Sequence, residues 1–178
     1  MTEYKYDLKI PKERVAVLIG TKGESKKHLE SETKTKIEVD SKEGDVSISG
    51  EDGLKLYAAR ELITAIGRGF NPKIALKLLN VDYSFELINL GDLARSKNDL
   101  IRLKGRVIGQ EGKSRKIIEE LTNCELCVYG KTIGIIGPVE FTPLARRAID
   151  MLLGGSTHAG VFKYLEKQRR NMNIQKIN

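Results

Sequence analysis

The fold of this chain is decided by two stretches, LIGTKGESKKHLESETKTKIEV at residues 18–39 and VIGQEGKSRKIIEELTNCELCV at residues 107–128. They align without a gap, because Gly109 and Gly112 each stand 89 positions after Gly20 and Gly23. The similarity resumes downstream, after a loop between two expected strands that is two residues shorter in the second copy. The sequence therefore contains one structural unit twice.

Hydrophobic spacing predicts the same order of elements in both copies, β-α-α-β-β-α, each followed by a further helical stretch. We expect an α+β fold of two domains, residues 1–80 and 81–178. Each domain has a three-stranded antiparallel sheet packed by three helices. The second domain ends in a basic C-terminal helix. The expected strands are 4–10, 36–39, 45–49, 85–90, 125–128 and 132–136, and the expected helices are 12–19, 24–32, 54–66, 72–79, 99–108, 113–121, 143–153 and 160–169.

An Ile-Gly-x-x-Gly loop between two helices, followed by two strands and a helix, resembles the type I KH domain. Residues 106–137, RVIGQEGKSRKIIEELTNCELCVYGKTIGIIG, are similar to the archaeal and eukaryotic two-KH ribosome-maturation factors. These are the pre-rRNA processing proteins known as partner of Nob one. The resemblance implies binding of single-stranded RNA near the 3′ end of 16S-type ribosomal RNA, in small-subunit biogenesis. It also implies two protein partners: a PIN-type endonuclease that trims this end, and the α subunit of translation initiation factor two.

Elementary chemistry supports RNA binding at both loops. Paired glycines let the backbone turn tightly, and the N-terminus of the following helix favours an anion. Such loops clamp about four nucleotides by their backbone. The candidate RNA-binding residues of the second copy are Arg106, Ile108, Gly109, Gln110, Glu111, Gly112, Lys113, Arg115, Lys116, Leu126 and Val128. Those of the first copy are Ile19, Gly20, Thr21, Lys22, Gly23, Lys26 and Lys27.

The two loops are expected to be unequal. Arg106, Lys113 and Arg115 should supply the positive field at the second loop, which we expect to be the principal RNA site. The isoleucine before each loop and the strand after the second helix should form an apolar groove for bases. In eukaryotic relatives the first loop tends to lose its glycines, but here it is intact, so its role as an RNA or a partner surface stays open.

Composition narrows the alternatives. A net charge of +7 favours a polyanionic partner, while 6% aromatic residues and no Trp argue against a stacking platform such as an RRM. No carboxylate cluster, nucleophile–histidine pair or metal-ligand set is evident, so we expect no enzyme activity, cofactor or metal. The N-terminus lacks the apolar core of a signal peptide, which favours a cytoplasmic location. No stretch of about 18 apolar residues is present, so we expect no membrane span. We also expect a monomer. The alternative function is an adaptor that links an initiation factor or a processing nuclease to RNA.

Three smaller features carry expectations of their own. Cys124 and Cys127 lack a second ligand pair, so we expect two reduced, partly buried cysteines. His28 aligns with Ile117 and should be partly buried, and His158 lies in the loop-like segment GGSTHAG. Acidic residues share the helices after both loops, so the alternative is that the basic residues there form an ordinary solvated face. These acidic residues are Glu30, Glu32, Glu119 and Glu120.

Overall fold

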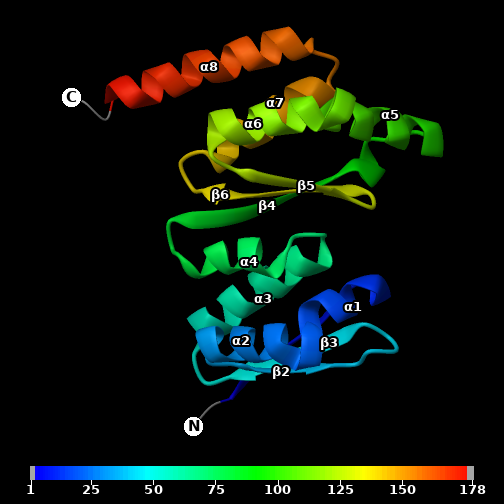
Figure 1. The fold of residues 1–178 in the computed structure, drawn as a ribbon, viewed down its shortest axis with the longest axis vertical. Helices are drawn as coiled ribbons and strands as arrows, with labels where there is room; N and C mark the ends of the chain where they lie inside the picture. The colour runs from blue at the N-terminus through cyan, green and yellow to red at the C-terminus, as the bar shows by residue number, and fades with distance from the viewer. Residues whose placement is uncertain (1–2, 176–178) are drawn as a thin grey trace. The chain divides into compact units, whose positions relative to one another are not determined.

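The computed structural model describes residues 3–175, and the chain divides between Val81 and Asp82 into two compact units. We call them module 1 and module 2. Figure 1 shows a three-stranded sheet with helices packed on it in each module. Each module has the element order β-α-α-β-β-α plus a further helix, so the predicted α+β fold with two type I KH units is confirmed.

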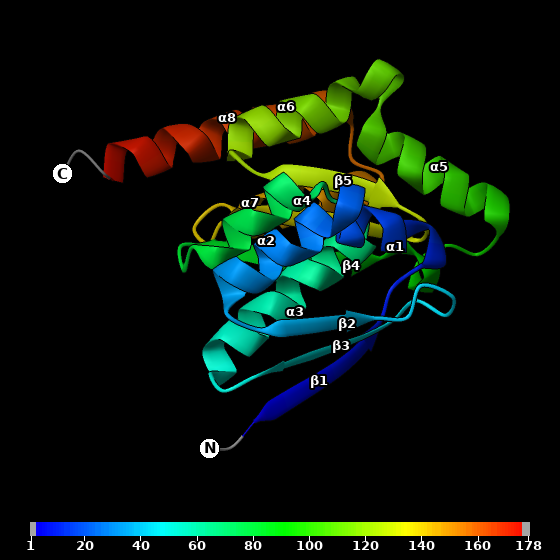
Figure 2. The ribbon, with the colours of Figure 1, turned by 60° about the horizontal axis from the view of Figure 1, so that its bottom comes forward.

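Module 1 contains a sheet with strand order β1-β3-β2, antiparallel throughout. Helices cover one face of this sheet (Figure 2), and Leu18, Leu29, Ile48 and Leu62 are fully buried there. Its elements are β1 (Tyr4–Lys9), α1 (Lys12–Ile19), the 3-10 turn η1 (Thr21–Gly23), α2 (Glu24–Thr33), β2 (Lys36–Val39), β3 (Asp45–Gly50), α3 (Gly53–Gly67), α4 (Pro72–Ala75) and the 3-10 turn η2 (Leu76–Leu79).

Module 2 repeats this arrangement with strand order β4-β6-β5. Its core joins Ile118 and Ile133 to residues of the two last helices, including Val161 and Leu165 of α8. The elements are β4 (Tyr83–Asn89), the 3-10 turn η3 (Leu90–Asp92), α5 (Lys97–Ile108), the 3-10 turn η4 (Gln110–Gly112), α6 (Lys113–Thr122), β5 (Glu125–Tyr129), β6 (Thr132–Pro138), α7 (Thr142–Leu153) and α8 (His158–Gln175).

Side-chain caps explain two of the helix starts. Asp52 accepts hydrogen bonds from the N–H groups of Leu54 and Lys55 at the start of α3. Ser96 accepts from the N–H of Asp99, so α5 begins at Lys97, two residues before the predicted start. Caps of this kind supply acceptors for first-turn N–H groups that have no partner within the helix.

Both histidine predictions were wrong. His28 is exposed, because its neighbour Leu29 is the α2 residue that faces the core. His158 lies in no loop: it is the first residue of α8, and its Nε2 lies 2.7 Å from the carbonyl oxygen of Arg106. Within residues 3–175, no helix is both long enough and apolar enough to cross a membrane.

Candidate nucleic-acid interface

The two glycine loops, loop 1 (residues 20–23) and loop 2 (residues 109–112), have nearly the same backbone conformation. The first glycine has φ 74° and ψ 176° in loop 1 and φ 72° and ψ 177° in loop 2. The last glycine has φ 75° and 74°, in the left-handed region. The third residue is also left-handed although it is not glycine: Lys22 has φ 54° and Glu111 has φ 53°. The aligned sequences thus encode one loop structure twice.

The two glycines of each loop have different tasks. A Cβ on Gly109 would stand 2.6 Å from the Cβ of Ser114 and 2.8 Å from its backbone nitrogen, so only glycine fits. A Cβ on Gly112 would meet nothing within 4 Å. The first glycine therefore packs the loop onto the following helix, and the last leaves open space beside the backbone. Gly20 and Gly23 repeat this division in module 1.

The open side of each loop adjoins a helix N-terminus. Neither α2 nor α6 has a side-chain cap at its first turn, since a glycine occupies the N-cap position. The first-turn N–H groups and the helix dipole favour an anion there. A nucleic-acid phosphate has the charge and the acceptor oxygens that such a site binds.

Basic residues near the loops fall into two groups. Four lysines are exposed and form no ion pair within residues 3–175: Lys22, Lys27, Lys113 and Lys116. These lysines are available to a phosphate backbone. Thr21, Gln110 and Glu111 are also exposed, as middle residues of their loops.

Lys26 and Arg115 belong to the second group, because each lies beside a carboxylate on its own helix. The Nζ of Lys26 is 3.1 Å from Oε1 of Glu30. The Nε of Arg115 is 3.9 Å from Oε2 of Glu119, which is too far for a hydrogen bond. This buried Nε has no hydrogen-bond partner among residues 3–175. The basic residue is therefore held more loosely in module 2 than in module 1.

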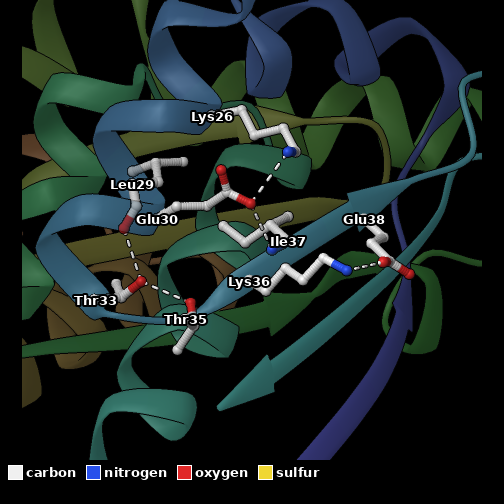
Figure 3. A network of polar contacts seen from close by, with 8 residues as sticks. All are labelled: Lys26, Leu29, Glu30, Thr33, Thr35, Lys36, Ile37 and Glu38. Carbon is white, nitrogen blue, oxygen red and sulfur yellow. Dashed lines mark hydrogen bonds and ion pairs between the residues drawn. The ribbon is translucent and has the colours of Figure 1, made fainter.

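The same two carboxylates also bind the strand that follows each helix. Oε1 of Glu30 accepts a hydrogen bond of 2.7 Å from the N–H of Ile37, as Figure 3 shows. Oε1 of Glu119 accepts one of 2.9 Å from the N–H of Leu126. Burial raises the pKa of Glu119, and the Leu126 N–H and Arg115 act in the opposite direction. The alignment placed these acids on the helices after the loops but did not predict their hydrogen bonds to the strands.

Arg106 has a structural role that the sequence did not predict. Its Nε donates to the carbonyl of Leu152 at 2.7 Å, and its Nη2 donates to that of Ser156 at 2.5 Å. Both carbonyls lie at the end of α7 or just after it. Arg106 therefore uses its charge to hold two helices together, and we leave it out of the phosphate-binding set.

Module 1 has an equivalent arginine at a different position. Arg14 donates through Nε to the carbonyl of Ile66 at 2.9 Å and through Nη2 to that of Phe70 at 2.8 Å. Arg14 aligns with Leu103, one helical turn before Arg106. Both modules thus have an arginine that binds two carbonyls near the end of a later helix, although the two arginines do not align in the sequence.

The predicted apolar residues differ in accessibility. Ile19 and Ile108, directly before the loops, are half-buried and can offer apolar surface. Val128 is also half-buried, whereas Leu126 is only 5% exposed and belongs to the core. Ile108 and Val128 are therefore the better candidates for contact with a base.

A Gly-x-x-Gly loop before an uncapped helix, next to an edge strand, defines a KH module, and this chain has two. The family model described as a eukaryotic-type (type I) KH domain matches residues 84–170, and a general KH-domain model matches residues 5–65. The KH domain-containing protein MJ0443 of Methanocaldococcus jannaschii is 50% identical over 169 residues, which are 93% of this chain and 74% of that protein. The chain belongs to the family of two-KH-domain proteins that includes archaeal Dim2p.

Solved structures agree with this assignment. Dim2p from Pyrococcus horikoshii is 46% identical with a TM-score of 0.86, and the match covers 92% of this chain and 99% of that one. A chain of the a/eIF2alpha–aDim2p–rRNA complex from the same organism is 44% identical with a TM-score of 0.89, covering 95% and 96%. A protein of unknown function from Aeropyrum pernix is 32% identical with a TM-score of 0.92, covering 99% and 96%.

Proposed function

We propose that this protein binds single-stranded RNA near the 3′ end of small-subunit ribosomal RNA during subunit biogenesis, mainly through loop 2. The observation that carries the proposal is the open backbone at Gly112 beside the uncapped N-terminus of α6. Lys113 and Lys116 add positive charge at this point. The Pyrococcus relative whose complex contains rRNA supports the choice of RNA.

Module 2 is the stronger candidate because its Arg115 is held less tightly by a neighbouring carboxylate than Lys26 is in module 1. Lys26 of module 1 is hydrogen-bonded to Glu30, while the buried Nε of Arg115 has no hydrogen-bond partner in the part of the chain that the structure describes. The proposed contact residues of loop 2 are Ile108, Gly109, Gln110, Glu111, Gly112, Lys113, Arg115, Lys116 and Val128. Loop 1, with Ile19, Gly20, Thr21, Lys22, Gly23 and Lys27, is the auxiliary surface.

The direct test uses two substitutions at one position. Gly112→Asp places a negative charge where a phosphate would bind, while Gly112→Ala adds a side chain at the same positive φ without the charge. Affinity for a labelled RNA with the 3′-terminal small-subunit sequence is measured by fluorescence anisotropy. We expect Gly112→Asp to lose about tenfold or more relative to Gly112→Ala, or about 1.4 kcal/mol. Equal affinities for the two variants would contradict the proposal.

A second candidate function is an adaptor, and the relative solved with a/eIF2alpha favours it. In this view the domains at residues 1–80 and 81–178 have different partners. Module 1 binds the α subunit of initiation factor two, and module 2 binds RNA. A PIN-type endonuclease as a further partner, a monomeric state and a cytoplasmic location belong to the same proposal. The test is co-purification with the initiation factor subunit after nuclease treatment at high salt. Capture that survives both treatments supports the adaptor, and complete loss after nuclease treatment contradicts it.

A further inference from the structure

The carboxylates of Glu30 and Glu119 make the same pair of contacts, one in each module. Each takes the first outward N–H of the edge strand and stands beside the basic residue one helical turn earlier. The three participants keep the 89-residue offset: Lys26 with Arg115, Glu30 with Glu119, and Ile37 with Leu126. A chance surface ion pair is not expected to recur with the same third partner.

The strand contact affects which backbone groups remain for RNA. The N–H of Leu126 bonds to Glu119, so it points away from β6, and in an antiparallel strand Val128 points the same way. Strand β5 is an edge strand, so these outward groups have no ladder partner. Glu119 occupies the first of them and leaves Val128 as the next donor. The carboxylate therefore sets where base contacts along the strand can begin.

The contact between Glu119 and Arg115 affects the electrostatic potential at loop 2. Arg115 lies two residues after Lys113, at the start of the helix whose N-terminus would hold a phosphate. Its Nε faces Glu119 at 3.9 Å without a hydrogen bond. A phosphate and Glu119 would therefore compete for the same guanidinium, and the carboxylate would also repel the phosphate.

We propose that Glu119 is a positioning residue of the RNA groove, which fixes strand β5 through Leu126 and restrains Arg115. Its carboxylate lowers the affinity for RNA and determines where base contacts along β5 begin. This inference rests on the proposed function, since it concerns the same groove. Glu30 has the same role in module 1, where its hold on Lys26 is tighter.

The test separates the two contacts by substitution. Glu119→Gln keeps an oxygen that can accept from Leu126 but removes the charge that restrains Arg115. We expect RNA affinity to rise about fivefold, because a nearby negative charge is gone. The slope of log affinity against log salt should steepen by about 0.7, as for one more phosphate contact on a single strand. Glu166→Gln, at an exposed position of α8, removes the same charge away from the loop 2 contact residues and is the control, which should change neither value appreciably.

Arg115→Gln in the Glu119→Gln background identifies the group that is released. Most of the gain should disappear in the double variant, because no guanidinium remains to meet the phosphate and only the relief of direct repulsion is left. A gain that persists in full without Arg115 would overturn the restraint of Arg115. A Glu119→Gln affinity equal to that of Glu166→Gln would overturn it as well.

Amide hydrogen exchange at Leu126 tests the strand contact without RNA. Exchange should remain slow in Glu119→Gln and become faster in Glu119→Ala, where no acceptor remains. Equal exchange in the wild type and Glu119→Ala would overturn the role of Glu119 in fixing β5. If the wild type binds no RNA, the proposed function fails, and this exchange measurement still reports on the strand contact.

Discussion

Gly109 packs so closely on Ser114 that a methyl group on the glycine would overlap the serine Cβ, at 2.6 Å. Gly20 and Ser25 repeat this contact in module 1 at the same distance. The first glycine of each loop is therefore a packing residue, and the last is the one beside open space. This difference separates substitutions that damage the fold from those that damage binding.

Gly109→Ala should destabilise the protein more than Gly112→Ala. Gly112, at φ 74° and ψ 12°, lies in the left-handed region, which costs an alanine about 1 kcal/mol. Gly109, at φ 72° and ψ 177°, lies in a region that essentially only glycine adopts. Only Gly109 adds a steric clash, and we expect a total of about 2–4 kcal/mol there. Urea unfolding monitored by circular dichroism measures both variants. Equal losses would show that the contact with Ser114 does not constrain the loop.

Ser114→Ala should be neutral or stabilising by up to about 1 kcal/mol. The Ser114 side chain is buried, and its hydroxyl has no hydrogen-bond partner among the described residues 3–175, so an alanine removes an unsatisfied group. Ser114→Val should be destabilising, because the larger side chain meets Gly109. A clear loss of stability in Ser114→Ala would mean that the hydroxyl has a partner in solution.

Arg106→Lys should lower stability by about 1–3 kcal/mol, because an ammonium cannot bond both carbonyls in the geometry that the guanidinium uses. Its RNA affinity, measured well below the unfolding temperature, should change little. Lys113→Ala should show the opposite pattern, with weaker binding and nearly unchanged stability. If Arg106→Lys bound RNA tenfold more weakly while keeping its stability, Arg106 would belong to the contact set after all.

Cys124 should be unreactive in the folded protein. Burial raises the pKa of its thiol to about 11, so only about one thousandth is thiolate at pH 8. A Cys127→Ser variant isolates it, and labelling with a thiol reagent should follow unfolding. Because the folded pKa lies above the usual 9.0, the contribution of Cys124 to stability is intact below pH 9 and falls as the pH approaches 11. Rapid labelling of the native variant would contradict the burial.

The repeat made most of the fold predictable. Helix 12–19 and strand 36–39 were predicted with their observed bounds, because local hydrophobic spacing and glycine positions determine them. The start of α8 was missed, because His158 is fixed by a contact with Arg106, 52 residues away in the chain. Periodicity along the sequence carries no information on such a partner.

The site was predicted less completely than the fold. Both loops and their exposed lysines are encoded locally, so they could be found in the alignment. The role of Arg106 could not, because its acceptors are backbone carbonyls and its counterpart Arg14 does not align with it. Glu119 did leave a signal: a basic residue four positions before an acid and an apolar strand residue seven after it, twice in the chain.

The central claim is that loop 2 and the edge of β5 hold single-stranded RNA. Backbone amide chemical shifts, followed by NMR while RNA of the small-subunit 3′-terminal sequence is added, test this most directly. We predict the largest changes at Gly109–Lys113 and at Val128, with smaller changes at loop 1. Changes confined to residues outside both loops, with the amides of Gly112 and Lys113 unaffected at saturating RNA, would contradict the claim.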